Sequence, residues 1–191
     1  MKVLALGGSG GMGRYAVQYL HNIKQIEKIY VADVNSISAK KFVSHFDNRV
    51  EGLKLDIRDF ETLKSEMSKV DIVVNTTGPF FLFAEPILKA AIQTNTHYFD
   101  ICDDWEPTEK MLQMNEDAKK ANITAIIGLG ASPGLTNILA HMAISELDEV
   151  RKVYTGWDMS AAKPESESSQ SGVSAATVSY THLRAHETYP H

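Results

Sequence analysis

The sequence of 191 residues has few of the features that mark secreted, membrane or nucleic-acid-binding proteins. Its single cysteine, Cys102, rules out an internal disulfide and a cysteine-rich zinc site, and it fits a reducing compartment. The apolar stretch at Val3–Leu6 is too short for a secretory signal, and no run approaches the ~18 residues of a membrane-spanning helix. Acidic residues number 24 against 19 lysines and arginines, so neither nucleic acid nor an anionic membrane is an expected partner. We expect a cytoplasmic protein.

The motifs of several enzyme classes are also missing. The sequence contains no G-x-S-x-G, H-E-x-x-H or Walker motif. No tyrosine is followed four residues later by the lysine with which a catalytic short-chain dehydrogenase lowers the tyrosine pKa. His21, His45 and His141 share no ligand spacing, so no metal site is expected. Apolar residues make up 43% of the chain, which is enough for a globular core without disulfides.

Short apolar runs alternate with helical patterns along the chain. Strands are expected at Val3–Leu6, Lys28–Ala32, Val50–Leu55, Val70–Val74, Tyr98–Ile101 and Ile123–Ile127. Helices are expected at Met12–Asn22, Ser38–Phe46, Asp59–Met67, a segment with Pro86 near its first turn, Pro107–Lys120 and Leu135–Leu147. This alternation predicts an α/β fold with a doubly wound parallel Rossmann sheet, because the right-handed crossover rule leaves few other topologies.

The first expected strand runs directly into a glycine-rich turn. The turn contains G-x-G-x-x-G, in which the first glycine allows a tight turn, the second lets the backbone approach a pyrophosphate, and the third allows a helix to pack closely on the sheet. The first amides of that helix would point at the phosphates. A glycine-rich turn without a ligand is the alternative. The expected phosphate-binding residues are Gly8, Ser9, Gly10, Gly11, Met12 and Gly13.

Polar residues follow the next three expected strands. Asp33 stands where a carboxylate accepts both ribose hydroxyls and repels a 2′-phosphate, so the expected cofactor is NAD or NADP, with NAD favoured. Asp56 is expected to hydrogen-bond the adenine amino group, and its alternative role is a helix cap. The loop after the fourth strand would pass beside the nicotinamide ribose. Its expected cofactor-binding residues are Thr76, Thr77, Gly78 and Pro79.

Three further polar residues follow the fifth expected strand, at the same edge of the sheet. Asp103 is the catalytic candidate, because a carboxylate there can position a substrate amine or move a proton. Asp104 is a candidate N-cap for the helix near Pro107. Cys102 is expected to be a small buried side chain rather than a nucleophile.

Six segments together resemble the N-terminal NAD(P)-binding domain of the saccharopine dehydrogenase-like oxidoreductases. They are Gly7–Gly13, Val31–Asp33, Asp56–Asp59, Val74–Phe80, His97–Asp103 and Gly130–Asn137. The resemblance implies hydride transfer between a nicotinamide and a C–N bond of an amino acid or imine. It also implies a small amino-acid-like substrate and a helix that starts after Pro133 near the nicotinamide. A homodimer is possible through a substrate domain that this chain is expected to lack. Many members have a tyrosine where this chain has Phe80.

The chain is expected to have three parts. Residues 1–148 form the dinucleotide-binding Rossmann domain, and residues 149–177 form a polar linker and the incomplete start of an α+β substrate domain, with a strand at Val150–Trp157. Val178–His191 resembles the translation of a transposase adapter used in sequencing libraries; a natural disordered tail is the alternative. We expect a chain that is cut off within its substrate domain and binds the cofactor without useful turnover. A non-catalytic NAD(P)-binding sensor is the alternative to an enzyme.

Overall fold

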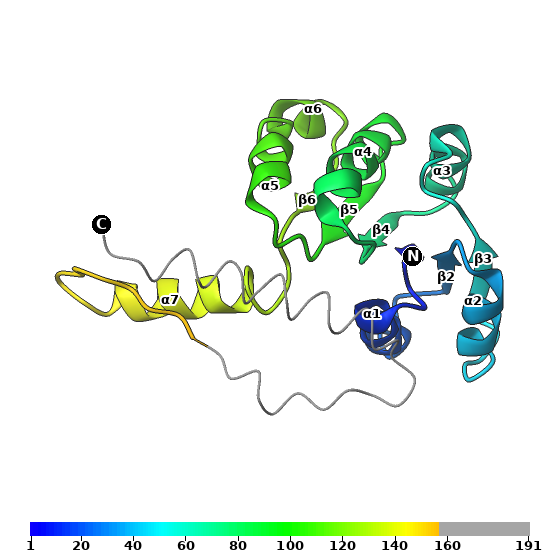
Figure 1. Ribbon diagram of the computed structural model, residues 1–191, viewed down its shortest axis with the longest axis horizontal. Helices are drawn as coiled ribbons and strands as arrows, with labels where there is room; N and C mark the ends of the chain where they lie inside the picture. Colours follow the sequence, from blue (N-terminus) through cyan, green and yellow to red (C-terminus); the bar gives the residue numbers. More distant parts are fainter. Residues whose placement is uncertain (157–191) are drawn as a thin grey trace. The chain divides into compact units, whose positions relative to one another are not determined.

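The computed structural model describes residues 1–156, and these residues form a six-stranded parallel sheet (Figure 1). The strands are β1 (Lys2–Leu6), β2 (Lys28–Asp33), β3 (Val50–Lys54), β4 (Ile72–Asn75), β5 (His97–Asp100) and β6 (Ala125–Ile126). Their order is β3-β2-β1-β4-β5-β6, so the direction of winding reverses between β1 and β4. In sheets of this kind a ligand binds outside the carboxyl ends of the strands at that reversal. The predicted fold class is confirmed.

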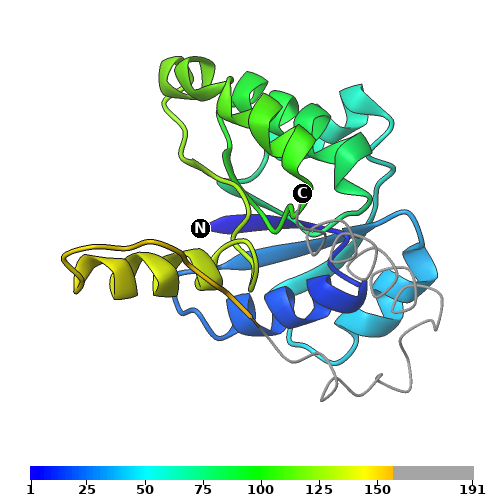
Figure 2. The same cartoon turned by 60° about the vertical axis from the view of Figure 1, so that its left-hand side comes forward.

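Helices cover the sheet in two layers (Figure 2). The helices are α1 (Gly11–His21), α2 (Ser36–Val43), α3 (Phe60–Met67), α4 (Phe80–Gln93), α5 (Trp105–Leu112), α6 (Asn115–Lys120) and α7 (Leu135–Ser145). Two of them, α1 and α2, cover one face, and α3 to α6 cover the other. Because each helix returns the chain to the start of the next strand, all carboxyl ends of the strands lie at one edge.

The central strand β1 supplies both halves of the core. Leu4 and Leu6 belong to the apolar cluster on the side of α3 and α4, whereas Val3 and Ala5 belong to the cluster on the side of α1 and α2. All four side chains are at most 2% exposed. Burial of such a leucine or valine stabilises the fold by roughly 1.5–3 kcal/mol. The strand that leads into the glycine turn is therefore held on both faces.

Two helices start where a capping side chain binds their first amides. Asp59 accepts from the amide of Thr62 (3.1 Å), as the sequence predicts for α3. Asn35 accepts from the amides of Ile37 and Ser38, so α2 begins at Ser36, two residues before the expected start. An uncapped helix end leaves these donors without protein partners.

Two helical expectations need correction. Helix α4 begins at Phe80 rather than near Pro86, because Phe80, Phe83, Ala84 and Ile87 already form one apolar face at helical spacing. Pro86 lies inside the helix on an exposed position, so the N–H that proline lacks is lost on the solvent side. The expected helix Pro107–Lys120 is two helices. They are separated by a tighter turn, in which the Met114 amide donates to the Met111 carbonyl three residues before it (3.1 Å).

The last described residues also differ from expectation. Residues 150–156 form no strand. A strand is held by hydrogen bonds to a neighbouring strand, and no pairing of the described sheet includes that segment. Trp157, most of the expected linker and the adapter-like segment Val178–His191 lie outside the described residues.

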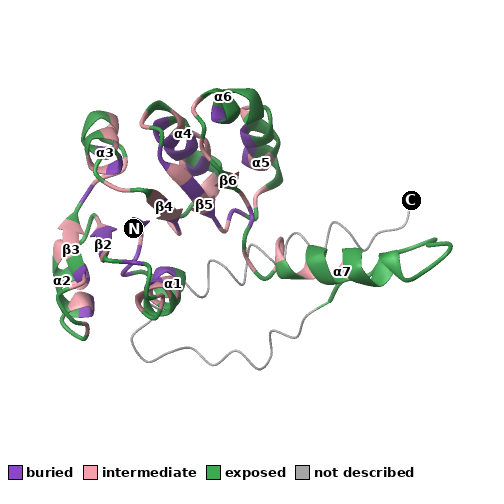
Figure 3. Ribbon diagram, turned by 180° about the vertical axis from the view of Figure 1, so that it is seen from behind, coloured by how far each residue is buried: buried purple, intermediate pink, exposed green. Residues whose placement is uncertain are grey.

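Helix α7 differs from the other long helices because it has no buried residue. Figure 3 shows it mostly exposed, with a few intermediate positions and no buried one. Leu135, Ile138, Leu139 and Met142 are each more than half exposed. None of the described residues therefore covers the apolar side chains of this helix.

Candidate functional site

The carboxyl ends of β1 to β4 border a cleft of about 490 Å³. It lies at the reversal of the strand order, where the topology predicts a ligand. Six of the expected cofactor-binding residues line it: Gly10, Asp33, Asp56, Thr76, Thr77 and Gly78. Residues from four separate loops thus meet at one place in the structure, and their cofactor-binding role stays a prediction.

A second hollow of similar size, about 520 Å³, lies between α4 and α6, away from the strand ends. Its charged side chains already have partners, since Lys89 pairs with Glu85 and Lys120 pairs with Asp117. None of the expected site residues lines it. We therefore place the candidate site in the cleft at the strand ends.

The glycine turn brings α1 into close contact with the end of β1. A Cβ on Gly13 would collide with the carbonyl oxygen of Gly7 and would lie 2.6 Å from the Cα of Gly8. A Cβ on Gly11 would meet no atom within 4 Å. Packing within the protein thus requires glycine at position 13 but does not require it at position 11.

The first turn of α1 offers free amides beside the cleft. Its N-cap residue is Gly10, which has no side chain to bind them, and the first turn contains no acidic residue. Gly11 and Met12 are exposed. Such a helix start favours an anion through its unpaired N–H groups and its dipole.

The Asp33 carboxylate is held from two sides at the end of β2. Its Oδ2 accepts from the Ser9 hydroxyl (2.5 Å), and its Oδ1 accepts from the amide of Asn35 (3.0 Å). Ser9 is buried. The expected role of Ser9 at a phosphate stays a prediction, while its contact in the protein orients Asp33.

Asp56 carries an ion pair that the sequence did not indicate. The Arg58 guanidinium binds both carboxylate oxygens, at 2.6 to 3.1 Å, and the Arg58 amide donates to Oδ1 (3.0 Å). Hydrogen bonds from Arg58 lower the pKa of Asp56 to about 2. Arg58 is the only cationic side chain among the described residues that line the cleft. A local pairing at i and i+2 is the signal that could have suggested it.

Two threonines follow β4, and only one hydroxyl has a partner. Thr76 donates to the carbonyl of Leu6 (2.9 Å) and so ties this loop to β1. The Thr77 hydroxyl is buried and has no hydrogen-bond partner, and a Cβ on Gly7 would lie 2.9 Å from it. A buried hydroxyl without a partner is costly, so it suits a site that a ligand or bound water completes. Together with the free amides at the start of α1, this hydroxyl gives the cleft unsatisfied polar groups that fit a dinucleotide.

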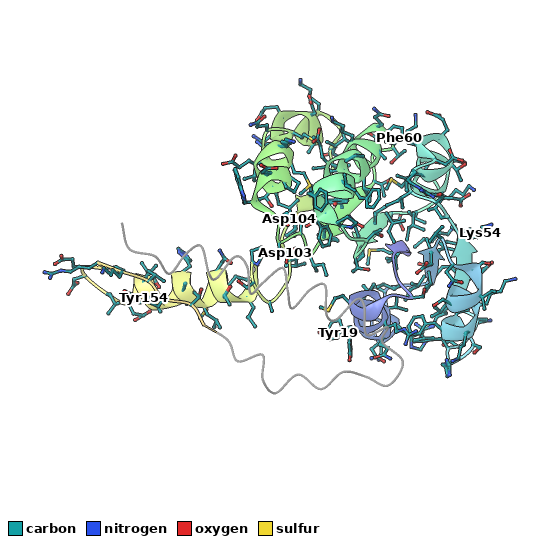
Figure 4. The ribbon with its side chains drawn as sticks, viewed as in Figure 1. Tyr19, Lys54, Phe60, Asp103, Asp104 and Tyr154 are labelled. Carbon is teal, nitrogen blue, oxygen red and sulfur yellow. The ribbon has the colours of Figure 1, made fainter. Side chains whose placement is uncertain are left out.

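The loop after β5 carries the two aspartates that Figure 4 labels. Asp103 is exposed, and its catalytic role stays a prediction. Asp104 makes no side-chain bond to its own helix; instead its Oδ2 accepts from the amide of Phe81 on α4 (3.0 Å). Asp104 thus stands at the N-cap position of α5, as expected, but its carboxylate binds the first turn of α4, whose own N-cap residue Pro79 has no capping side chain. Cys102 is buried, and burial raises the pKa of its thiol to about 11, which disfavours the thiolate at neutral pH.

Sequence reasoning missed a buried polar chain at the ends of β4 and β5. Asn75 donates to the hydroxyl of Tyr98 (3.2 Å), which donates to the carboxylate of Asp100 (2.7 Å). Burial raises the pKa of Asp100 and that of Tyr98. Two signals could have indicated this chain of bonds: the spacing of Tyr98 and Asp100, which places both on one face of β5, and the strand register, which places Asn75 opposite Asp100.

Four polar side chains repeat one local bond where the chain leaves a strand. Asp33, Asp56, Asn75 and Asp100 each accept, through Oδ1, the amide two residues further on at 3.0 Å. Short side chains of this type close such turns readily. Each turn fixes the start of a loop that borders the cleft or continues its edge.

Other kinds of site find no support in the part of the chain that the structure describes. No group of three potential metal ligands occurs there. None of the helices in that part is both long and apolar enough to pass through a membrane.

The family described as the saccharopine dehydrogenase NADP-binding domain matches residues 3–126, well over half of the chain. The chain belongs to this family. The saccharopine dehydrogenase [NADP(+), L-glutamate-forming] of Schizosaccharomyces pombe is 26% identical over 152 residues, which are 80% of this chain and 32% of that protein. A lipid droplet localized protein of Caenorhabditis elegans is 28% identical over 139 residues, 67% of this chain and 32% of that protein.

A solved relative has the same fold. The structure of the L-glutamate-forming saccharopine dehydrogenase of Saccharomyces cerevisiae matches with a TM-score of 0.66 at 23% identity, over 76% of this chain and 31% of that one. The present member of the saccharopine dehydrogenase NADP-binding domain family thus spans about a third of the length of the relatives that it matches. The family match ends at Ile126, before α7.

We predict that Gly13→Ala and Gly11→Ala differ sharply in this domain. The new methyl group at position 13 meets backbone atoms, so the free energy of unfolding should fall by roughly 1–3 kcal/mol. At position 11 it enters open space at the start of a helix, so stability should stay the same or rise slightly. Urea unfolding measures both values. Equal losses would contradict the assigned contact.

We predict that carboxyl NMR titration finds an Asp56 pKa of about 2, and that Arg58→Ala moves it back toward 3.8. Because the folded pKa is lowered, the ionised Asp56 contributes stability above pH 3.8, and the contribution disappears as pH falls toward 2. Asp59 is the internal control, since Thr62 lowers its pKa and Arg58 does not touch it. An Asp56 pKa near 3.8 in the unmutated chain would refute the ion pair.

Proposed function

We propose that this chain is the cofactor-binding part of a nicotinamide-dependent oxidoreductase that transfers hydride at a C–N bond of an amino acid or imine. The observation that carries the proposal is the buried, unpartnered Thr77 hydroxyl beside the glycine turn, in a cleft at the reversal of the strand order. Membership of the saccharopine dehydrogenase NADP-binding domain family supports it. A bound nicotinamide would supply or accept the hydride.

The residues of this chain would divide the work of binding. The free amides at Gly11 and Met12 would hold the pyrophosphate. The Thr77 hydroxyl would bind on the nicotinamide side, in the loop that would pass beside the nicotinamide ribose. Asp33 would accept the ribose hydroxyls of the adenosine half, since Ser9 and its own turn already orient it. Asp56 and Arg58 would border the adenine.

We propose that NAD is the preferred cofactor, although the family is described as an NADP-binding domain and the Schizosaccharomyces pombe relative is named for NADP(+). A 2′-phosphate would lie against the Asp33 carboxylate, and the residues directly after it are Val34, Asn35 and Ser36, none of which is cationic. Two like charges within a few ångströms repel by ~1 kcal/mol or more.

We predict a smaller dissociation constant for NADH than for NADPH in the unmutated chain, measured by the fluorescence of the bound reduced nicotinamide. Asp33→Asn should improve NADPH binding relative to NADH by roughly tenfold, because it removes the charge and keeps the side-chain shape. Asp71→Asn is the matched control, since Asp71 binds the Lys2 amide at the opposite edge of the sheet. Tighter binding of NADPH than of NADH by the unmutated chain would reject the NAD preference. If the unmutated chain binds neither nucleotide, the proposed function is rejected.

The remaining expectations concern the whole protein. We propose a small amino-acid-like substrate and a homodimer, and we propose that the protein works in the cytoplasm, although one relative is named for lipid droplets. Asp103 would position a substrate amine or move its proton from the exposed loop after β5. For the chain alone we propose binding without turnover, since the part that it shares with each of these relatives is only 32% of that relative's length.

We predict that this chain binds NADH yet shows no steady oxidation or reduction with amino or imino acids, followed at 340 nm. A longer protein that contains this domain should turn over, and Asp103→Asn in it should lower kcat by about 10²–10⁴-fold if the carboxylate moves a proton. Asp117→Asn, on the exposed side of α6, serves as the control. Turnover by this chain alone would reject the assignment of catalysis to the whole protein. A longer protein that binds but never turns over would favour a nucleotide sensor.

A further inference from the structure

Three loops at the carboxyl edge of the sheet share one buried set of hydrogen bonds. They are residues 76–79 after β4, residues 101–104 after β5 and residues 127–134 after β6. The bonds meet at Asp100, which ends β5 and is 1% exposed. Asp100 therefore links the three loops that follow β4, β5 and β6.

The Asp100 carboxylate receives three donors. Oδ1 accepts from the amides of Cys102 (3.0 Å) and Gly128 (2.8 Å), and Oδ2 accepts from the Tyr98 hydroxyl (2.7 Å). The Asp100 carbonyl also accepts from the amide of Leu129 (2.7 Å). One residue therefore binds the loop that carries Asp103 and the loop that leads to α7.

The same bonds continue to the loop after β4. The Tyr98 hydroxyl accepts from the side-chain amide of Asn75 (3.2 Å), and Asn75 Oδ1 accepts from the amide of Thr77 (3.0 Å). Tyr98 and Asn75 are fully buried. The chain of bonds thus reaches the residue whose hydroxyl has no partner in the cleft. A change at Tyr98 removes a donor from Asp100 and an acceptor from Asn75 at once.

We propose that Asp100 is a positioning residue that holds these three loops as one unit for the nicotinamide half of the cofactor, with Tyr98 and Asn75 extending its hold to Thr77. The inference rests on the proposed function. The adenosine half lies elsewhere, against Asp33 and Asp56 on β2 and after β3, and none of the bonds of Asp100 reaches those residues. The network therefore affects one half of the ligand and not the other.

Tyr98→Phe tests this inference, because it removes one oxygen and keeps the buried ring. Dissociation constants are measured for NADH and for ADP, which has the adenosine and both phosphates but no nicotinamide riboside. The variant should weaken NADH binding by roughly three- to tenfold, as expected for one lost hydrogen bond to a charged group that acts partly on the ligand. ADP binding should change less than twofold. Amide hydrogen exchange at Cys102 and Gly128 should become faster.

Thr96→Val is the matched control. Thr96 is as buried as Asp100 and precedes the other end of the same strand, where its hydroxyl binds the Met67 carbonyl (3.1 Å). The variant should lose a similar share of stability and leave both dissociation constants unchanged. If Tyr98→Phe does not fold, Asn75→Ala removes the bonds to Tyr98 and Thr77 instead, and the same difference between NADH and ADP is expected.

The outcomes separate the two proposals. Equal weakening of NADH and ADP, or no weakening of either, overturns the positioning role while leaving the proposed function in place. Equal affinity of the unmutated chain for NADH and ADP also overturns it, because no contact with the nicotinamide riboside would then exist. Failure of the unmutated chain to bind either ligand overturns the proposed function, and this inference with it.

Discussion

The close contact between Gly13 on α1 and the turn after β1 determines the geometry of the cleft. Because no Cβ stands between them, the first turn of α1 lies directly on the backbone of Gly7 and Gly8. The helix axis and the free amides at its start follow from that contact. The apolar faces of β1 hold the other side of the contact, since Leu4 and Leu6 are buried in one layer and Val3 and Ala5 in the other.

The cleft joins two sets of groups with different chemistry. On the side of β2 and β3 it presents carboxylates, with Asp33 bound to Ser9 and Asp56 paired with Arg58. Beside the glycine turn it presents amides and the unpartnered Thr77 hydroxyl. Unpaired amides favour anionic phosphates, and carboxylates accept ribose hydroxyls, so both sets of groups suit the proposed dinucleotide.

The sequence predicted well most features that depend on neighbours along the chain, although the local pair of Asp56 and Arg58 was missed. Short apolar runs identified all six strands, and the spacing of the glycines located the turn. Local pattern failed where a distant residue decided the outcome. Helix α4 starts before Pro86 because its apolar face packs on the core and Asp104, 23 residues away, binds its first turn. Tyr98 looked like an ordinary strand residue, because its partners Asn75 and Asp100 become neighbours only when β4 and β5 pair.

The turns that end the strands limit which replacements the chain tolerates. In Asp33, Asp56 and Asp100 one carboxylate oxygen closes the turn, and the other binds a different group: Ser9, Arg58 or Tyr98. Glutamate has the same charge, but its extra methylene places the oxygens too far out to close a turn over two residues. Aspartate and glutamate are therefore not interchangeable at these three positions, whereas on the outer faces of α3 and α6 either acid can pair with a nearby lysine.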